Sequence, residues 1–479
     1  MNSHCRRYTP ASGISRRAWL MRMTGGLGAL ALSDLMSGQA QAALPGVPHF
    51  PAKAKRVIFL TMTGGMSHLE SFDHKPELKR LQGEQIPASA MAGKKPLGMS
   101  SQQASFPLVG CGVDFAQHGQ SGAWVSASFP HLARVADDLT FVKSLFSEAV
   151  NHDPALAFLQ TGAQLAGRPS MGAWLDYGLG SINRDLPAFI TLTSNRPVDQ
   201  PLSSRMWDSG FLPSRYAGVQ FRSGTDPVLY LSNPPGVTPD ATRRMLNGLR
   251  DLHEMERSTD GDAVIDSKIE QFEMAYRMQS AVPDVTDISN EPKSVLDLYG
   301  EDVGKPGSFA KNCLLARRLA ERDVRFIQLF HPGWDHHGSL PRGFEIGGLE
   351  VDRASAALIT DLKQRDMLKD TLVVFGSEFG RTSYSQGGIS KKTGNYGREH
   401  HRDCFTFWMA GGGIKPGVSY GSTCEFGFRV AENPVSMHDF HATLMHLMGI
   451  DHERFTFRYQ GRDFRLTDVS GKIIKGILS

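Results

Sequence analysis

The stretch that decides the fold is Phe326–Gly338, which reads Phe-Ile-Gln-Leu-Phe-His-Pro-Gly-Trp-Asp-His-His-Gly. A largely apolar run at its start is typical of a strand covered on both faces, as in a parallel sheet. The glycine-flanked turn that follows carries Asp335 and His337. Because α/β sheets hold ligands outside the carboxyl ends of their strands, this turn is predicted to lie at a ligand-binding edge.

Two later segments repeat this arrangement of an apolar run beside polar groups. Leu372–Phe375 is followed by Ser-Glu-Phe-Gly-Arg, and Gly-Arg-Glu-His-His lies just before the apolar run Phe405–Met409. Carboxylates and imidazoles are common ligands of divalent metals, and arginine binds anionic oxygens. We therefore predict metal ligands Asp335, His337, Glu378 and His400, and anion-binding residues Arg381 and Arg398.

The same residues also allow a structural reading. Asp335 is a turn residue that can satisfy backbone N–H groups, and Glu378 with Arg381 can form an ion pair that holds a turn. His400 and His401 are adjacent in the sequence. Side chains of adjacent residues in an extended chain point in opposite directions, so only one of the two is expected to bind.

Strand-like and helical patterns alternate along the chain. This alternation predicts an α/β fold, with a mixed, mostly parallel sheet and helices on both faces. The expected strands are Arg56–Met62, Leu139–Leu145, Ala188–Leu192, Arg325–Phe330, Leu372–Phe375 and Phe405–Met409. Helices are expected over about 308–322, with Ser308 as N-cap, and over about 349–368. Asp439 is expected to cap a helix that ends at Gly449.

The segment from about 194 to 290 differs from the rest and is interpreted as an insertion. Its first part, to Pro235, is rich in Pro, Ser, Gly and Arg and is expected to be irregular, over the sheet edge or as a lid. Two helices are expected after it. One starts at Thr238-Pro239-Asp240, and one runs over about 264–279 and is ended by Pro283.

Further site candidates follow the first two strands and open the C-terminal helix. His68, Asp73 and His438 are predicted as additional metal ligands. Asn151 and His152 follow the second strand, where an enzyme that works covalently is expected to carry its nucleophile, but no Ser, Thr or Cys occupies this turn. We therefore predict that these two residues position substrate or water, with His152 as a general base near its unperturbed pKa.

The first 42 residues are interpreted as a twin-arginine signal peptide. Arg16-Arg17 precedes a weakly apolar segment over 25–36, and Ala40-Gln41-Ala42 is a small-residue cleavage site. The apolar segment is too short and Gly-rich to be a stable membrane anchor. We expect the twin-arginine translocase to export the protein, which would place it in the periplasm or outside the cell.

Charge gives no basis for binding nucleic acid. The chain has 52 basic and 49 acidic residues, of which five and one lie in the first 42 positions. The remaining 47 basic and 48 acidic residues give a net charge of −1. No basic surface for a phosphate backbone is therefore expected.

Eight motifs are spread over the chain. They are Gly64-Gly65-x-Ser67-His68, Phe72-Asp73-His74-Lys75-Pro76, Gly167-Arg168-Pro169-Ser170-Met171-Gly172, Gly333-Trp334-Asp335-x-His337, Gly376–Thr382, Gly397–His400, Ala410–Gly413 and Tyr459–Phe464. Together they resemble the alkaline phosphatase and sulfatase superfamily, and more closely the twin-arginine-exported bacterial proteins of domain-of-unknown-function family fifteen-oh-one. The resemblance implies one alkaline phosphatase-like domain over residues 43–479.

In the wider superfamily, Asp and His residues bind one or two divalent metals, and a Ser, Thr or formylglycine attacks phosphorus or sulfur. The resemblance implies an exported metal-dependent hydrolase of phosphate or sulfate esters. Its cofactor would be zinc, calcium or manganese, and its substrate a small anionic ester or glycan ester. The alternative is a non-catalytic protein that uses the same pocket to bind a ligand or partner.

Three departures from the superfamily pattern oppose a covalent mechanism. Asn151 stands where the nucleophile is usual, Phe379 replaces a His ligand, and Thr63 lies near the place of an Asp ligand. Attack by water on a metal-bound ester is the mechanism that remains.

Overall fold

The computed structural model describes residues 43–96, 98–196, 202–224, 227–229, 231–260, 263–387 and 395–479, with only the backbone for 253–260 and 263–267. The predicted twin-arginine signal and its cleavage site fall on residues 1–42, outside the described residues. Within the described ranges, no helix has both the length and the apolarity needed to cross a bilayer.

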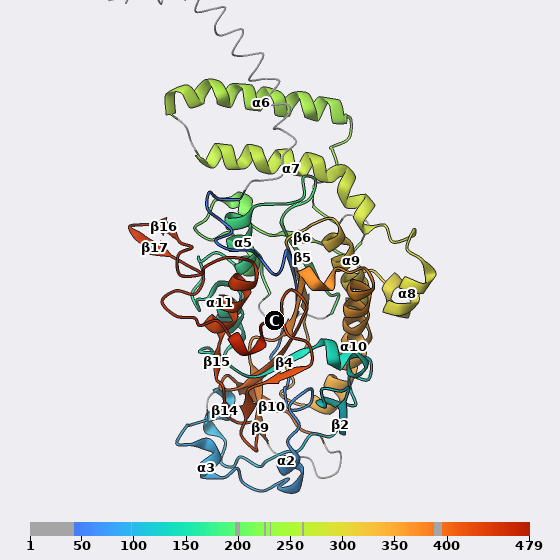
Figure 1. Cartoon of the computed structure of the whole chain (residues 1–479), viewed down its shortest axis with the longest axis vertical. Helices are drawn as coiled ribbons and strands as arrows, with labels where there is room; N and C mark the ends of the chain where they lie inside the picture. Colours follow the sequence, from blue (N-terminus) through green and yellow to red (C-terminus); the bar gives the residue numbers. More distant parts are fainter. Residues whose placement is uncertain are drawn as a thin grey trace, which may run out of the picture.

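A nine-stranded, mostly parallel sheet forms the centre of the molecule (Figure 1). From one edge to the other the strands are β12 (Val418–Tyr420), β4 (Thr140–Phe146), β11 (Phe405–Ala410), β8 (Thr371–Gly376), β1 (Arg56–Met62), β7 (Phe326–His331), β5 (Phe189–Thr193) and β6 (Val219–Phe221), and β15 (Val435–Ser436) also pairs with β4. β11 runs antiparallel to both β8 and β4, whereas the other pairings in this sheet are parallel. The six predicted strands are confirmed to within a residue or two.

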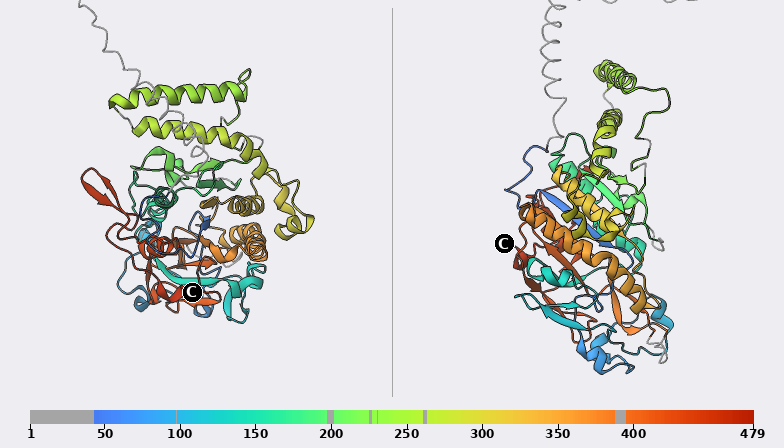
Figure 2. Two further views of the ribbon diagram at one scale, coloured as in Figure 1. Left: turned by 45° about the horizontal axis from the view of Figure 1, so that its top comes forward. Right: turned by 90° about the vertical axis from the view of Figure 1, so that its right-hand side faces the viewer.

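Helices cover both faces of this sheet (Figures 1 and 2). The α-helices of the described residues are α2 (Pro76–Arg80), α3 (Ala88–Met91), α4 (His152–Thr161), α5 (Met171–Leu179), α6 (Pro239–Asp260), α7 (Ala263–Thr286), α8 (Lys293–Tyr299), α9 (Phe309–Glu321), α10 (Leu340–Gln364) and α11 (Met437–Leu447), of which α4, α5, α9, α10 and α11 pack on the sheet. Successive side chains of a strand point to opposite faces. Ile58 and Leu60 pack in the core under α9 and α10, and Val57 and Phe59 pack in the core under α4, α5 and α11.

The predicted start of one helix is confirmed, and that of another is wrong. α9 begins as predicted, because the Ser308 side chain accepts a hydrogen bond from the Lys311 N–H. α10 begins at Leu340, well before the predicted start. Gly343 and Gly347 weaken the helical pattern of its first turns in the sequence. They have a packing role, because a Cβ at Gly343 would collide with the ring of His336 and a Cβ at Gly347 with the ring of Trp334. α10 therefore packs tightly on the turn that carries Asp335.

The predicted N-cap of the C-terminal helix is wrong. Ser436 caps α11, and Asp439 lies at the third helical position, where its carboxylate accepts a hydrogen bond from the Ser436 N–H. This pair is a capping box, and its Ser-x-x-Asp spacing is visible in the sequence.

The predicted insertion contains the two expected helices, α6 and α7, at the opposite end of the molecule from the β9–β10 hairpin (Figures 1 and 2). Pro283 lies inside α7 and does not end it. The Arg318 guanidinium donates to the carbonyls of Asp284, Val285 and Asp287, which lie in the last turn of this helix and just beyond, and so stabilises its C-terminal end. The segment expected to be irregular also contributes the edge strand β6.

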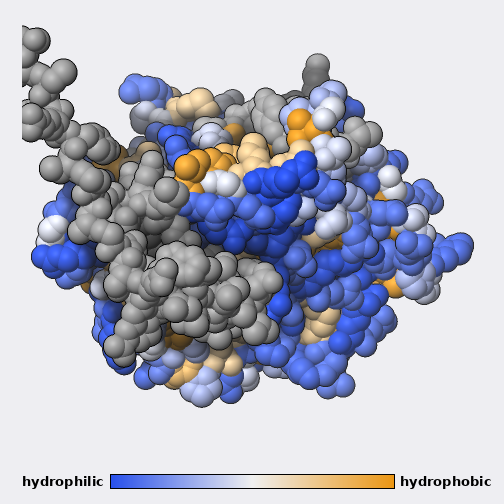
Figure 3. All heavy atoms as spheres, turned by 90° about the horizontal axis from the view of Figure 1, so that it is seen from above, coloured by the Kyte–Doolittle hydropathy of each residue, from blue (hydrophilic) through white to orange (hydrophobic). Residues whose placement is uncertain are grey.

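The arm formed by α6 and α7 carries a mixed surface. Seen from above, hydrophilic and apolar side chains lie side by side on this end of the molecule (Figure 3). Leu246 of α6 is buried, while Met245, Leu249 and Leu252 are exposed. None of these residues contributes to the site described below.

Four small two-stranded sheets complete the fold. They are β9 (Gly380–Ser385) with β10 (Arg398–His401), β2 (Phe115–His118) with β3 (Ala123–Ser126), β13 (Ser422–Thr423) with β14 (Val430–Glu432), and β16 (Phe457–Tyr459) with β17 (Arg462–Phe464). β9 follows β8, and β10 comes just before the antiparallel β11. The β9–β10 hairpin therefore lies at the same edge of the sheet as the carboxyl ends of β1, β7 and β8.

Candidate functional site

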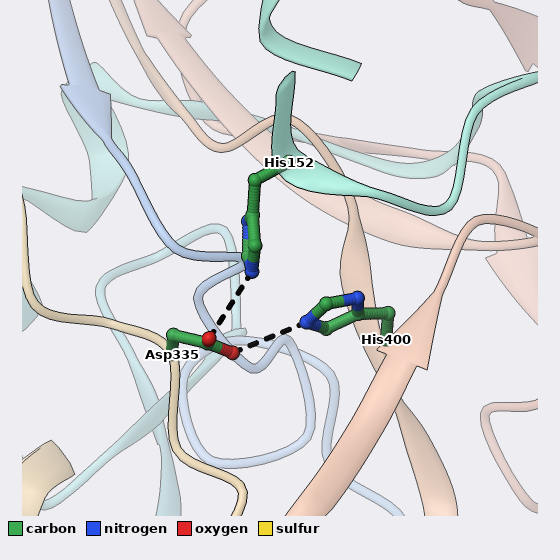
Figure 4. A group of neighbouring side chains, drawn as sticks. All are labelled: His152, Asp335 and His400. Carbon is green, nitrogen blue, oxygen red and sulfur yellow. Dashed lines mark hydrogen bonds and ion pairs between the residues drawn. The ribbon is translucent and has the colours of Figure 1, made fainter. Parts of the chain in front are cut away.

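Four side chains from three parts of the chain converge at this edge. They are His152 at the start of α4, Asp335 and His337 in the turn after β7, and His400 on β10, and we call them the imidazole cluster. Figure 4 shows the Asp335 carboxylate between the rings of His152 and His400. The structure thus brings together three of the predicted metal ligands with His152, which was predicted as a base.

Close backbone approach makes this convergence possible. Gly64, in the turn after β1, has φ +117°, and a Cβ there would lie 2.6 Å from the Asp335 nitrogen. Gly397, just before β10, lies so close to the His337 carbonyl that a Cβ would overlap it. Only glycine at these two positions lets the turns after β1 and β7 and strand β10 approach one another.

The distances within the cluster resemble those between ligands of one metal ion. The Nε2 atoms of His337 and His400 lie 2.9 and 3.2 Å from Asp335 Oδ1 and 3.1 Å from each other. His152 Nε2 lies 3.3 Å from Asp335 Oδ2. Donors bound to tetrahedral zinc at about 2.0–2.2 Å lie about 3.3–3.6 Å apart. A small outward movement of the side chains around an ion would satisfy this geometry.

The outer nitrogen of each ring is bonded to an acceptor. His400 Nδ1 donates to the Val150 carbonyl at 2.9 Å, His337 Nδ1 to Gln386 Oε1 at 2.5 Å, and His152 Nδ1 to Glu378 Oε1 at 2.6 Å. A carbonyl or carboxylate only accepts, so Nδ1 carries the proton in each ring. When a ring is neutral, its Nε2 therefore presents a lone pair to the cluster, as metal-binding histidines do.

Charge and burial affect these groups in different directions. Burial lowers the pKa of His400, an effect that its bond to Asp335 opposes and the charge of Arg381 reinforces. Burial also acts to lower the pKa of His152, but contacts with Asp335 and Glu378 outweigh it and raise this pKa to about 9, so the prediction that His152 keeps its unperturbed pKa is wrong. Burial acts to raise the pKa of Asp335, but bonds from the three imidazoles and the Arg381 charge hold it well below its usual range.

Two features of the cluster call for a cation. A neutral His400 and a neutral His337 would place two lone pairs 3.1 Å apart, and such atoms repel unless a proton or a metal ion lies between them. His152 Nε2 is enclosed by protein, and its contact with Asp335 Oδ2 at 3.3 Å lacks the geometry of a well-formed hydrogen bond. The residues present therefore fit a bound divalent metal ion.

Glu378 and Arg381, the other predicted residues of this edge, lie behind the cluster. The Glu378 carboxylate is fully buried and accepts hydrogen bonds from His152 Nδ1 and from the Gly64 N–H at 2.9 Å. The Arg381 guanidinium donates to the carbonyls of Gly64 and Gly65 and to Asp335 Oδ1 at 2.5 Å. The two groups do not pair with each other, and instead hold His152 and Asp335.

The prediction that Arg398 binds a substrate anion needs correction. Its side chain is fully buried, and its guanidinium donates to Glu70, at 2.6 Å, and to the carbonyls of Val109 and Thr382. Arg381 is equally enclosed, with 1% of its side chain exposed. Every donor contact of these two arginines is made inside the protein, so both support the site and do not face a ligand.

Three predicted ligands lie outside the cluster. His68 is buried with Nε2 3.1 Å from the Gly427 carbonyl, and Asp73 pairs with Lys75 at 3.0 Å. His438 Nε2 donates to the Gly162 carbonyl at 3.0 Å. His68 and Asp73 follow the first strand as expected, but the chain turns away from the cluster before it reaches them.

Sequence reasoning missed three contributors to the site. Glu399 Oε1 lies 3.9 Å from Nδ1 of both His337 and His400. Gln386 and the Val150 carbonyl orient these two rings. Glu399 had a visible signal, because it directly precedes a predicted ligand, whereas nothing in the sequence around Gln386 or Val150 marks a contact with the site.

Solved structures similar to the chain include a sulfatase and an alkaline phosphatase. Ps i-CgsB in complex with k-i-k-neocarrahexaose is 12% identical, with a TM-score of 0.35 over 82% of this chain and 72% of that chain. PsFucS1 sulfatase from Pseudoalteromonas sp. is 12% identical, with a TM-score of 0.33 over 90% and 72%. The alkaline phosphatase from the Antarctic bacterium TAB5 is 9% identical, with a TM-score of 0.30 over 83% and 98%.

Residues 54–478 match the family Protein of unknown function (DUF1501), so the chain belongs to this family. No curated protein matches the chain. The family match spans the whole sheet and every residue of the imidazole cluster, and it confirms the family expected from the sequence motifs.

Proposed function

We propose that the protein is a metal-dependent hydrolase of phosphate or sulfate esters. The observation that supports this best is the 3.1 Å separation between the Nε2 atoms of His337 and His400, both of which face Asp335. Two imidazoles and one carboxylate that leave a coordination position open are typical of catalytic metal sites. The expected substrate is a small anionic ester or an ester on a glycan.

The donor set favours zinc among the three expected metals. Calcium prefers six to eight oxygen ligands, and manganese is suited by carboxylate, carbonyl and water. Imidazole nitrogen suits zinc, which binds three protein ligands in catalytic sites. Asp335, His337 and His400 would hold the ion, which when bound polarises an ester oxygen and lowers the pKa of water.

His152 and Asn151 occupy the side of the cluster where α4 begins. His152 Nε2 faces Asp335 and would hold or move a proton there. Asn151 is the N-cap of α4, yet its side chain makes no capping bond and is exposed. It would bind water or an ester oxygen. The N-terminus of a helix attracts anions, which suits a negatively charged ester.

A metal titration followed by an ester panel tests this proposal. Chelator-treated protein should bind one zinc ion by calorimetry, calcium should bind far more weakly, and the zinc form should hydrolyse p-nitrophenyl phosphate, bis-p-nitrophenyl phosphate or p-nitrophenyl sulfate. His337→Ala should lose both properties, whereas His118→Ala, on strand β2 outside the cluster, should keep them. Failure of the wild type to bind zinc would exclude the metal site.

Two observations favour a second function. Both arginines expected to bind the substrate anion are buried and bonded to protein groups, and Asn151 replaces the usual nucleophile. A binding protein that keeps the fold and the metal-facing cluster accounts for this equally. Zinc binding without turnover on any ester of the panel would favour the binding protein over the hydrolase.

We also infer export by the twin-arginine translocase, on the order of motifs in residues 1–42. Replacing Arg16 and Arg17 by lysine should leave unprocessed protein in the cytoplasm, because this pathway reads the arginine pair. Fractionation and N-terminal sequencing measure the outcome, with a start near Ala43 expected for processed wild type. Normal periplasmic levels of the double variant would contradict this route.

A further inference from the structure

The three imidazoles of the cluster differ in what holds their outer nitrogens. His337 bonds to a neutral amide, and His400 to a backbone carbonyl. Only His152 bonds to a carboxylate, that of Glu378, at 2.6 Å. A bond to a charged acceptor is roughly twice as strong as one to a neutral group. His152 is therefore the ring whose orientation is fixed most firmly.

The Glu378 carboxylate is itself held rigidly on the protein side. Oε1 accepts from both His152 Nδ1 and the Gly64 N–H, and Oε2 lies 2.9 Å from Ser377 Oγ. None of its side-chain surface is exposed. Both oxygens are thus engaged away from Asp335, so the carboxylate is not placed to bind the ion that the cluster would hold.

The His152 ring has no freedom to turn away. Its centroid lies 4.9 Å from that of Phe379 and 4.3 Å from that of His400, with the two imidazole planes at 74°. Packing fixes the plane of the ring, and Glu378 selects which edge faces inward. Nε2, whose lone pair or proton the proposed function uses, points at Asp335 as a result.

We propose that Glu378 is a positioning residue that acts through His152 and is not a metal ligand. The proposal rests on the proposed function, because it assigns His152 Nε2 to the open side of the metal site. From the sequence, Glu378 is predicted as a metal ligand because it follows β8, and the proposal replaces that role. Removing the carboxylate should release the His152 ring while leaving Asp335, His337 and His400 able to bind zinc.

The test uses Glu378→Gln, which keeps the size and one acceptor oxygen, and Glu378→Ala, which removes the acceptor. In chelator-treated wild type, proton NMR with 15N-labelled histidine should show a far-downfield resonance on His152 Nδ1, assigned by its loss in His152→Gln. This resonance should move upfield in Glu378→Gln and disappear in Glu378→Ala. Zinc affinity of Glu378→Gln should stay within about threefold of wild type, while kcat falls about 10–100-fold with KM little changed.

Two results would overturn the proposal. One is a His152 resonance that is unchanged in a folded Glu378→Ala protein. The other is a loss of zinc affinity of about 100-fold in Glu378→Gln, which would make Glu378 a ligand. Absence of zinc binding in the wild type would instead refute the proposed function, and the NMR measurement on metal-free protein would still decide the role of Glu378.

Discussion

The turns after β7 and β8 look alike in the sequence and do opposite things in the structure. Each follows a buried strand that pairs with β1, and each carries an acid with a basic residue two or three positions later. Asp335 and His337 keep 18% and 24% of their side chains exposed, whereas Glu378 and Arg381 keep 0% and 1%. The first turn faces the proposed metal site, and the second forms the wall behind it.

The difference arises from the neighbouring segments. Gly64 donates its N–H to Glu378 and leaves room for the turn after β7 to pass close by. Arg381 is held by the carbonyls of the same glycine turn. An acid after a strand therefore signals the ligand edge of the sheet, but its hydrogen-bond partners decide whether it faces the ligand or the protein.

Loss of the buried ion pair between Arg398 and Glu70 should have the largest effect on the free energy of unfolding. Arg398→Ala leaves the Glu70 carboxylate buried without its guanidinium, and breaking such a pair costs about 3–5 kcal/mol of unfolding free energy. Urea denaturation measures this loss. Arg402→Ala is the control, because Arg402 only reaches the Glu148 carbonyl near the surface. If Arg398→Ala is as stable as wild type but binds substrate more weakly, Arg398 contacts the substrate and does not support the fold.

Changing the turn after β7 should abolish metal binding while the fold is kept. Asp335→Asn retains the shape of the side chain but removes the charge that both His337 and His400 face, so zinc affinity should fall at least about 100-fold, or about 2.7 kcal/mol. Calorimetry measures the affinity, and circular dichroism checks the fold. Asp114→Asn, whose side chain is 92% exposed, should bind zinc like wild type. Equal affinities in the two variants would remove Asp335 from the site.

The pH dependence of stability should follow His152. The bonds to Asp335 and Glu378 raise its pKa to about 9 in the folded protein, above its unfolded value of about 6.5. The stability from this group is fully present below about pH 6.5 and is lost as pH rises through about 9. In chelator, the melting temperature of wild type should therefore drop more between these limits than that of His152→Gln. Parallel curves for the two proteins would contradict this linkage.

The smallest effect is expected at Asn151. Its side chain makes no capping bond, so Asn151→Ala should change the unfolding free energy by less than about 0.5 kcal/mol. Hydrolysis of the best ester should fall only partially, because an amide positions water and does not attack. Complete loss of turnover, or a covalent phospho- or sulfo-enzyme trapped by rapid quenching, would overturn the water mechanism.

Most of the sheet could be predicted, because strands buried on both faces are nearly continuous apolar runs. The convergence of Asp335, His337 and His400 also followed from the rule that strand ends share one edge. The orientation of Glu378, Arg381 and Arg398 could not be predicted, since it depends on backbone groups of the turn after β1 and on Thr382 and Val109. The start of α10 was hidden by glycines whose packing partners, Trp334 and His336, are visible only in three dimensions.

The antiparallel strand β11 has a consequence for how the site is assembled. A ribosome makes the chain from its N-terminus, so His400 is the last member of the imidazole cluster to be synthesised. It reaches its place only when β11 inserts between β8 and β4, which joins segments far apart in the chain. Such non-local pairing forms slowly compared with local contacts. A nascent chain therefore lacks the full set of proposed ligands, and under the proposed function metal loading would follow the folding of the C-terminal part.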